Sequence, residues 1–399
     1  MTPVSLLPSS AESGASPISQ VDAAPSRPIG TTAVVYCEGN FGELDGKTAN
    51  GLVRHSDRYQ VLSVIDSRRA GSDAGAVLDG APNGIPVHRD LRAAIAALGG
   101  APDHFIFGVA PASGLLSPTE RAVVLDAIAL GMHIVNGLHE FLNEDPEFVA
   151  ASVASNVTLT DVRRPRPKKD LRVFSGRIFD VVCPRIAVLG TDGAIGKRTT
   201  ATLLTQALNA RGINAVMVGT GQTSLIQGAK HGVALDAIAP QFCSGELEAA
   251  VVDAAADGNP DVIIVEGQGA LSHPAYLTSA YILRGSQPAG VVLQHAPKRL
   301  ALSDYPTLPM PTPASEINLI QTFASTTVIG LTLNHEHMTG DEIEISIADH
   351  EALLGIPVCD PLTSSPDRLV EMVLAAFPEL EPAEFEPPAL EPAAAAAGG

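Results

Sequence analysis

The sequence predicts an α/β protein with an N-terminal Rossmann-like parallel-sheet domain followed by a P-loop NTPase-like parallel-sheet domain. Two observations support this fold class. Short apolar runs alternate with amphipathic helical segments, which is typical of parallel strands joined by crossover helices. In the second half of the chain, an apolar strand, a glycine-bearing loop and a helix follow one another over residues 185–200, an order typical of phosphate-binding loops.

Composition and charge narrow the class of protein. The 399 residues are 45% hydrophobic and 17% charged, which suits two globular domains. The formal charge of −19 argues against general binding to nucleic acid or anionic lipid. The four cysteines form no C-x-x-C pair, and residues 1–30 lack the features of a signal peptide. We expect a cytoplasmic protein with a small-molecule substrate and no nucleic-acid or membrane partner.

Changes in composition indicate the domain boundaries. A basic, proline-bearing run separates the two βα patterns, and both ends of the chain are rich in proline and alanine. We expect tails at both ends, with two domains and a linker between them, over residues 1–30, 31–162, 163–171, 172–378 and 379–399.

The first domain carries only weak functional signals. Strands are expected at 32–37, 60–66, 104–110 and 156–162, and helices at 47–55, 91–98 and 118–130. Asp66 ends a strand where such folds often hold a ribose, but the loop at 38–43 lacks G-x-G-x-x-G, so NAD binding is disfavoured. The pair His139 and Glu140 either lines a cleft or forms a local structural contact, and the second interpretation is favoured.

The second domain opens with the strongest signal. Glycines allow a tight turn whose N–H groups face an anion, and Lys197 begins a helix, whose N-terminus favours negative charge. The spacing differs from the common G-x-x-x-x-G-K-[ST] loop, because Arg198 follows the lysine and Thr199 comes one place later. Phosphate binding is favoured over a plain βα turn, and the expected binding residues are Gly190, Thr191, Asp192, Gly193, Gly196, Lys197, Arg198 and Thr199.

Further polar residues follow the later strands. Glu266 ends a β-branched run and is placed to hold Mg²⁺ or orient a substrate, and Gln268 and His273 come soon after it. Gln222 and Thr223 lie in a polar glycine loop over 220–224, which is equally well a plain turn. Ser244 is expected to cap a helix. Three cations, Arg284, Lys298 and Arg299, suit contacts with phosphate or carboxylate, or are solvated surface charges.

The loop over 190–197 resembles the G-T-D-x-x-x-G-K loop of dethiobiotin synthetase and its relatives. The segment Val265-Glu-Gly-Gln-Gly269 resembles the V-E-G-x-G strand end of the same enzymes. Those enzymes use ATP and Mg²⁺, and their metal-binding threonine follows the loop lysine. Because Arg198 stands at that position here, the resemblance implies that Thr199 and Glu266 hold the metal if ATP and Mg²⁺ are used.

A longer resemblance covers nearly all of residues 34–360. It is carried by stretches in both domains: Gly108–Pro111, Asn136–Leu142, Asp161–Arg163, the Gly190 loop, Thr220–Thr223, Glu266–Gly269 with His273-Pro274, and Arg284–Ser286. By these stretches the chain is identified as a member of the two-domain family that includes the bacterial D-glutamate N-acetyltransferases. A homo-oligomer is expected by the same resemblance.

That resemblance implies acetyl transfer from acetyl-CoA to the amine of an acidic amino acid, with coenzyme A on the Gly190 loop. An amine must lose a proton before it attacks a thioester, and Glu266 and His273 are the candidate bases. The expected substrate-binding residues are Gln222, Thr223, Gln268 and Arg284. Two alternatives stay open: an ATP- and Mg²⁺-dependent ligase or kinase acting on a carboxylate, and a nucleotide-binding protein without chemistry.

Overall fold

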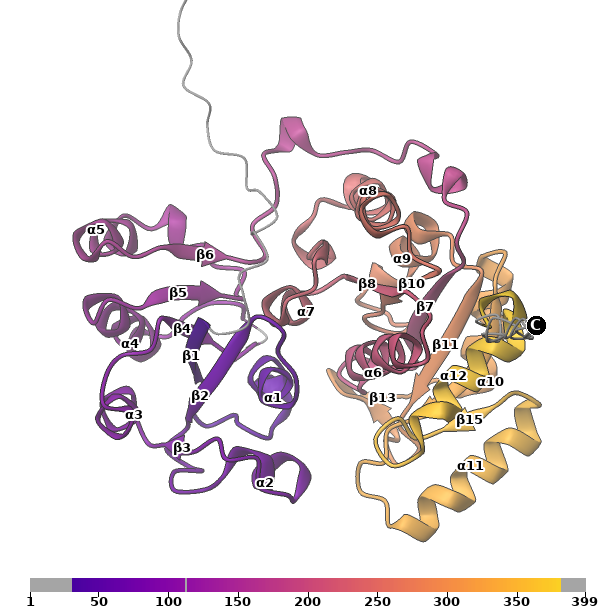
Figure 1. Cartoon of the computed structure of the whole chain (residues 1–399), viewed down its shortest axis with the longest axis horizontal. Coiled ribbons are helices and arrows are strands. Elements are labelled where there is room, and N and C mark those ends of the chain that lie inside the picture. Colours follow the sequence, from indigo (N-terminus) through magenta and orange to yellow (C-terminus); the bar gives the residue numbers. More distant parts are fainter. Residues whose placement is uncertain (1–30, 112, 382–399) are drawn as a thin grey trace, which may run out of the picture.

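The computed structural model describes residues 31–111 and 113–381. The expected tail over 1–30 and the tail residues 382–399 lie outside the described residues. Figure 1 shows two α/β domains, coloured from indigo to magenta and from magenta to yellow, that meet along one side. None of the helices formed by the described residues is long and apolar enough to cross a bilayer.

The first domain is a six-stranded sheet in which all pairings are parallel. Its strands are β1 (Thr31–Tyr36), β2 (Tyr59–Ile65), β3 (Val87–His88), β4 (His104–Phe107), β5 (His133–Asn136) and β6 (Leu159–Asp161). Its helices are α1 (Lys47–Arg54), α2 (Ala74–Asp79), α3 (Leu91–Leu98), α4 (Pro118–Ala129) and α5 (Pro146–Ser155). The strand order β3-β2-β1-β4-β5-β6 is that of a Rossmann fold.

The second domain is a seven-stranded parallel sheet in the order β15-β14-β11-β7-β10-β8-β9, with a small hairpin of β12 and β13. The strands are β7 (Arg185–Gly190), β8 (Ala215–Gly219), β9 (His231–Gly232), β10 (Val262–Glu266), β11 (Gly290–His295), β12 (Ala301–Leu302), β13 (Tyr305–Pro309), β14 (Thr327–Leu333) and β15 (Val358–Cys359). The helices are α6 (Lys197–Ala210), α7 (Gln222–Gln227), α8 (Pro240–Gly258), α9 (Thr278–Ser286), α10 (Pro313–Phe323), α11 (Gly340–Leu354) and α12 (Pro366–Ala376). Both parts of the predicted fold class are therefore confirmed.

Two local predictions were wrong. Ser244 does not cap a helix, because α8 begins earlier, at Pro240, whose ring fixes a helical φ at the first position. The segment 220–224 is not wholly a loop, because α7 begins at Gln222. The start of α7 is held by the carboxylate of Glu266, a residue too far along the chain for a local pattern to reveal.

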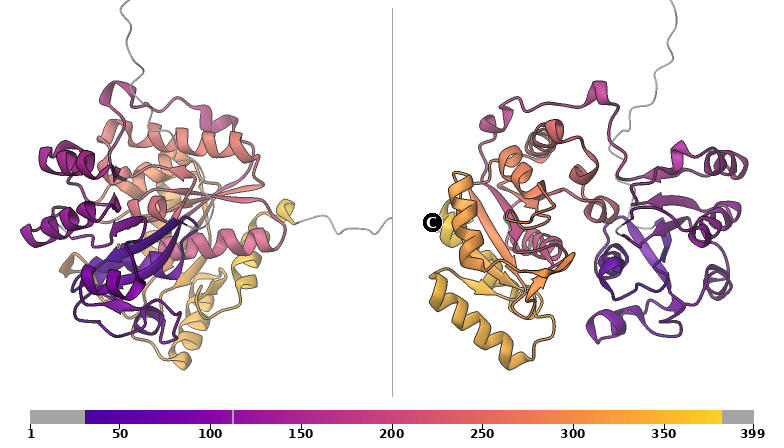
Figure 2. Two further views of the ribbon diagram at one scale, coloured as in Figure 1. Left: turned by 60° about the vertical axis from the view of Figure 1, so that its left-hand side comes forward. Right: turned by 180° about the vertical axis from the view of Figure 1, so that it is seen from behind.

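Helix α7 belongs to the second domain but packs against the first. Ile226 is buried in the hydrophobic core of the first domain. Thr223 shares a hydrogen bond with Thr48 of α1, 2.9 Å between the hydroxyl oxygens, and the Gln227 amide donates to the carbonyl of Gly51 at 2.8 Å. Figures 1 and 2 show α7 beside α1 where the two domains meet. The junction therefore has a defined packing rather than a loose linker.

Asp66 has a structural role in this fold. Its buried carboxylate accepts hydrogen bonds from the backbone N–H groups of Phe41 and Arg68, at 2.9 and 2.8 Å. Those bonds fix the loop after β1 to the end of β2. The carboxylate that would hold a ribose in a dinucleotide-binding fold is therefore already engaged.

Candidate functional site

The phosphate-loop geometry is present at the carboxyl end of β7. Gly190 is the last residue of β7, and Gly196 turns the chain into α6 with φ of 103°, a conformation that favours glycine. Within the described part of the chain, no hydrogen-bond acceptor is seen for the N–H groups from Ala194 to Thr199. Free N–H groups at the start of a 14-residue helix are the arrangement with which helix N-termini bind anions in general.

Lys197 lies inside this loop. Its side chain is 5% exposed, and its ammonium donates a hydrogen bond to the backbone carbonyl of Asp192. Burial lowers the pKa of Lys197 to about 7, with Asp192 acting in the opposite direction. A buried cation that has only a neutral carbonyl as partner gains free energy when an anion binds beside it.

We expect sulfate affinity to fall as the pH rises from about 6 to about 9, because the bound anion stabilises protonated Lys197. Binding raises the lysine pKa above its free value of about 7, so the complex takes up a proton between the two values. Sulfate suits this test because it does not titrate in the range. Calorimetry in buffers of different ionisation enthalpy measures both effects. A flat pH profile, or one that persists in Lys197→Met, contradicts the assignment.

Asp192 fixes the loop from beneath and is fully buried. Its carboxylate accepts hydrogen bonds from the backbone N–H of Gly193 at 2.7 Å and of Ser303 at 2.9 Å. It also pairs with Arg299 at 3.0 Å, and Arg299 pairs in turn with Glu336 at 2.8 Å. Arg299 is therefore neutralised within the protein, while Asp192, through the Ser303 N–H, joins the loop to the turn between β12 and β13.

Glu266 ends β10, which lies next to β7 in the sheet. One carboxylate oxygen, Oε2, accepts hydrogen bonds from the N–H groups of Thr220 at 2.8 Å and Gly221 at 3.2 Å, and from the Ser224 hydroxyl at 2.6 Å. The other oxygen, Oε1, accepts none from the described residues. Burial raises the pKa of Glu266, while the Ser224 hydrogen bond opposes that change. Oε1 is thus available to a ligand or a proton.

Arg198 occupies the position where the common loop has a magnesium-binding hydroxyl. Its guanidinium instead donates to the Gln227 amide oxygen in α7. It also lies so close to Gly51 of α1 that a methyl group there would fall 2.3 Å from Nη2. Two residues further along α6, the Thr200 hydroxyl donates a hydrogen bond to the side-chain oxygen of Gln294 at 2.5 Å. The described residues hold no group of three or more His, Cys, Asp or Glu side chains arranged for a metal ion.

His273 faces the same region. It is 5% exposed and stacks on Tyr276 with 4.5 Å between ring centroids. Its Nδ1 accepts a hydrogen bond from the N–H of Ala275 at 3.2 Å, so the neutral ring carries its proton on Nε2, for which the described residues offer no acceptor. Burial lowers its pKa, and Asp192 and Lys197 both act on it electrostatically, which places it beside the loop. His273 is thus arranged to donate a hydrogen bond.

The remaining predicted residues separate into two groups. Gln222, Thr223 and Gln268 lie near Glu266, but their side chains already bond to Arg163, Thr48 and the carbonyl of Thr220. Arg284 lies elsewhere. It is in the last turn of α9, over the ring of Phe323 at 5.1 Å.

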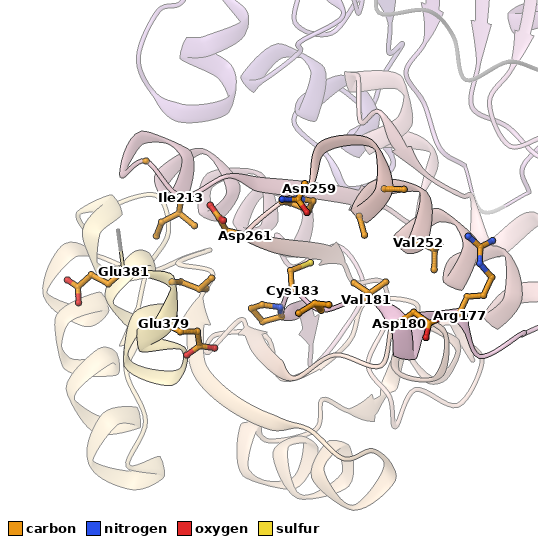
Figure 3. A pocket seen from close by; sticks show the side chains of 17 residues that line it. Arg177, Asp180, Val181, Cys183, Ile213, Val252, Asn259, Asp261, Glu379 and Glu381 are labelled. Carbon is orange, nitrogen blue, oxygen red and sulfur yellow. The ribbon is translucent and has the colours of Figure 1, made fainter. Parts of the chain in front are cut away.

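The end of α9 lies at the amino edge of the sheet. Arg185, the first residue of β7, donates to the carbonyl of Ser286 at 3.0 Å. A pocket of about 780 Å³ opens at this edge and is lined by residues such as Cys183, Asp261 and Glu379 (Figure 3). Its lining is mainly apolar and acidic and lies at the far end of the strands from the Gly190 loop. The candidate site is therefore the carboxyl edge, where the unpaired N–H groups lie.

Two residues at the junction between the domains were not predicted to lie there. Arg163, expected in a solvated linker, is 7% exposed and pairs with Asp236 at 2.7 Å, and it donates to the Gln222 amide at 2.9 Å. Lys47, the first residue of α1, is followed by Thr48, whose hydroxyl bonds to Thr223 across the junction. The sequence places Lys47 on a helix, but no local pattern indicates that this helix meets the second domain.

Comparisons with known proteins agree with both domains. Residues 67–165 match the DUF1611_N Rossmann-like domain and residues 172–370 match the DUF1611_C P-loop domain, both described as domains of unknown function. The chain belongs to the DUF1611 family. A crystal structure of a DUF1611 family protein from Anabaena variabilis is 30% identical, has a TM-score of 0.79, and covers 87% of this chain and all of its own.

Two curated proteins that are similar in sequence to this chain are named D-glutamate N-acetyltransferase. The protein from Tritonibacter scottomollicae is 31% identical over 281 residues, which is 68% of this chain and 80% of the relative. The protein from Pseudoalteromonas sp. is 32% identical over 276 residues, which is 67% of this chain and 80% of the relative. The predicted family membership is confirmed.

Proposed function

We propose that this DUF1611 protein is an N-acetyltransferase that moves the acetyl group of acetyl-CoA to the amine of an acidic amino acid, with D-glutamate as the preferred acceptor. The observation that carries the proposal is a phosphate loop with a buried lysine but with Arg198 in place of the magnesium-binding hydroxyl. Such a loop binds phosphates without arranging a metal for phosphoryl transfer. The names of the two relatives support the same reaction.

In this proposal the Gly190 loop binds the pyrophosphate of coenzyme A. The unpaired N–H groups from Ala194 to Thr199 and the Lys197 ammonium supply the hydrogen bonds and the charge. The binding free energy is then used to hold the thioester in place rather than to break a phosphoanhydride bond. ATP and Mg²⁺ are not consumed.

The proposed chemical step uses two side-chain atoms that have no hydrogen-bond partner among the described residues, Oε1 of Glu266 and Nε2 of His273. The ammonium of the acceptor gives a proton to Glu266 Oε1, whose raised pKa favours taking it. The amine nitrogen attacks the thioester carbon and the C–N bond forms; the C–S bond then breaks, and the second proton lost by the nitrogen passes to the sulfur, so that coenzyme A leaves as the thiol. The Nε2–H of His273 donates to the carbonyl oxygen as negative charge develops on it. This assigns His273 as a donor and Glu266 as the base.

The direct test is release of free thiol from acetyl-CoA with D- or L-glutamate, run beside ATP hydrolysis under matched conditions. Thiol release that requires the amino acid and is indifferent to ATP and Mg²⁺ supports the proposal. Consumption of ATP without thiol release contradicts it and supports a ligase or kinase. Tight nucleotide binding with no turnover contradicts it and supports a non-catalytic protein.

Glu266→Gln is expected to lower kcat by roughly 100-fold or more, because general bases typically contribute factors of this size. Glutamine keeps an acceptor oxygen for Thr220 and Ser224, so the protein should still fold. Thiol-release kinetics at saturating acetyl-CoA measure the effect, with thermal unfolding as the check on folding. Glu344→Gln, on the exposed face of α11, is the matched control. Unchanged turnover in Glu266→Gln removes Glu266 as the base.

A further inference from the structure

Lys47 lies at the contact between the two domains. It begins α1, and Thr48, Gly51 and His55, on successive turns of the same helix or at its end, contact residues of the second domain. Gly51 is four residues after Lys47, so the two lie on the same side of the helix one turn apart. Gly51 lies against the guanidinium of Arg198, the neighbour of Lys197, so this side of α1 packs against the side chain that follows the loop lysine.

Hydrogen bonds of neighbouring residues show which side of the junction the start of α1 faces: Thr48 bonds to Thr223, and the adjacent Gln222 accepts a hydrogen bond from Arg163. The charges that act on Lys47 come from both domains: Arg163 and Asp45 from the first side of the junction, and Asp236 and Asp304 from the second domain. Lys197 and Lys47 also act on each other. The start of α1, which includes Lys47, therefore lies on the side of the junction that holds the Arg163–Asp236 ion pair and Arg198.

Lys47 has no counter-ion in close contact. Within the described residues it makes no ion pair with a carboxylate within 4.0 Å, whereas Arg163 is fully engaged by Asp236, Gln222 and the Gly137 carbonyl. Lys47 is an exposed residue. The protein around its ammonium nevertheless lowers the pKa of Lys47, and the positive charge of Arg163 lowers that pKa further. A partly desolvated cation next to a second cation attracts an anionic ligand.

We propose that Lys47 binds the side-chain carboxylate of the acceptor amino acid, so that the Rossmann-like domain selects the acceptor while the P-loop domain binds the acyl donor. This inference rests on the proposed acetyl transfer. An ammonium without a counter-ion at this position favours an acidic acceptor, because a neutral amino acid has no side-chain carboxylate to pair with it. It also gives the first domain a role that its missing dinucleotide fingerprint leaves open.

The test compares Lys47→Gln and Lys47→Arg with wild type and with Lys230→Gln. Lys230 pairs with Asp257 on the surface and serves as the matched lysine control. We expect KM for D-glutamate to rise about 10- to 100-fold in Lys47→Gln, the loss of one charge-assisted hydrogen bond. Lys47→Arg should recover much of the difference. The dissociation constant for coenzyme A should change by less than about threefold in each variant, because Lys197 holds the phosphates.

Calorimetry of D-glutamate with the protein saturated with coenzyme A gives a second readout that needs no turnover. Weaker binding of D-glutamate in Lys47→Gln, with coenzyme A binding retained, supports the inference. An unchanged KM and binding constant for D-glutamate, or a loss confined to coenzyme A, overturns it. If wild type releases no thiol with any acidic amino acid, the proposed function fails, while the calorimetric comparison still decides whether Lys47 binds an acidic amino acid.

Discussion

Replacing Lys197 with methionine is expected to abolish turnover and to weaken coenzyme A binding by roughly 100-fold or more. The variant removes the one ammonium that is buried in the loop, and charge-assisted hydrogen bonds to phosphate are among the strongest in proteins. Methionine fills similar space without a charge, so the fold should be kept or slightly stabilised, because a buried cation costs free energy in the absence of its ligand. Calorimetry with coenzyme A and the thiol-release assay measure the two effects.

The control for this variant is Lys298→Met. Lys298 lies at the surface and pairs with Glu342 at 2.6 Å, and surface pairs contribute little. The Lys298→Met variant should therefore bind coenzyme A with the same affinity as wild type. Binding of coenzyme A by Lys197→Met within about threefold of wild type would show that the phosphates lie elsewhere, and the proposed loop site would then be abandoned.

Gly267→Ala is expected to destabilise the protein by roughly 3 kcal/mol or more, among the larger effects of single substitutions. A methyl group at Gly267 would lie 2.0 Å from the backbone carbonyl oxygen of Val188 in β7. That carbonyl belongs to the strand that carries the phosphate loop, so relief of the clash must separate β10 from β7. Urea unfolding measures the loss, and residual activity should fall with it.

Gly258→Ala is the matched control. Gly258 is the last residue of α8, and a methyl group there meets only a Val216 side-chain carbon at 3.9 Å. Alanine is the better helix former, so this variant should equal or exceed wild type in stability. If Gly267→Ala unfolds at the same urea concentration as Gly258→Ala, the two strands are not packed as closely as the structure shows.

The phosphate loop was predictable because its determinants are local. An apolar strand, glycines at a turn and a lysine at the start of a helix lie within sixteen residues, and the structure has β7, the turn at Gly196 and α6 over the same stretch. Glu266 was predictable for a related reason. In a parallel sheet the strands end at the same edge, so a carboxylate that ends β10 comes close to the loop that follows β7.

Arg284 lies at the opposite edge of the sheet, contrary to the prediction. It follows Glu266 by eighteen residues, and the intervening segment includes α9, which returns to the amino edge of the sheet. A crossover helix has to run back before the next parallel strand can begin, so residues near its end lie far from the carboxyl edge. Consideration of helix direction would have placed Arg284 away from the phosphate loop.

The sequence by itself determined the α/β class, the two-domain order, the phosphate loop and the carboxylate beside it, because periodicity, glycine placement and strand order act over short distances. Only the tertiary structure decided that α7 is a helix, since Glu266 accepts a hydrogen bond from the Gly221 N–H, 45 residues away, and Ile226 packs the helix into the first domain. The same junction brings α1, which begins at Lys47, against Arg198 at the start of α6. The position of one domain against another depends on such distant contacts, which no local pattern specifies.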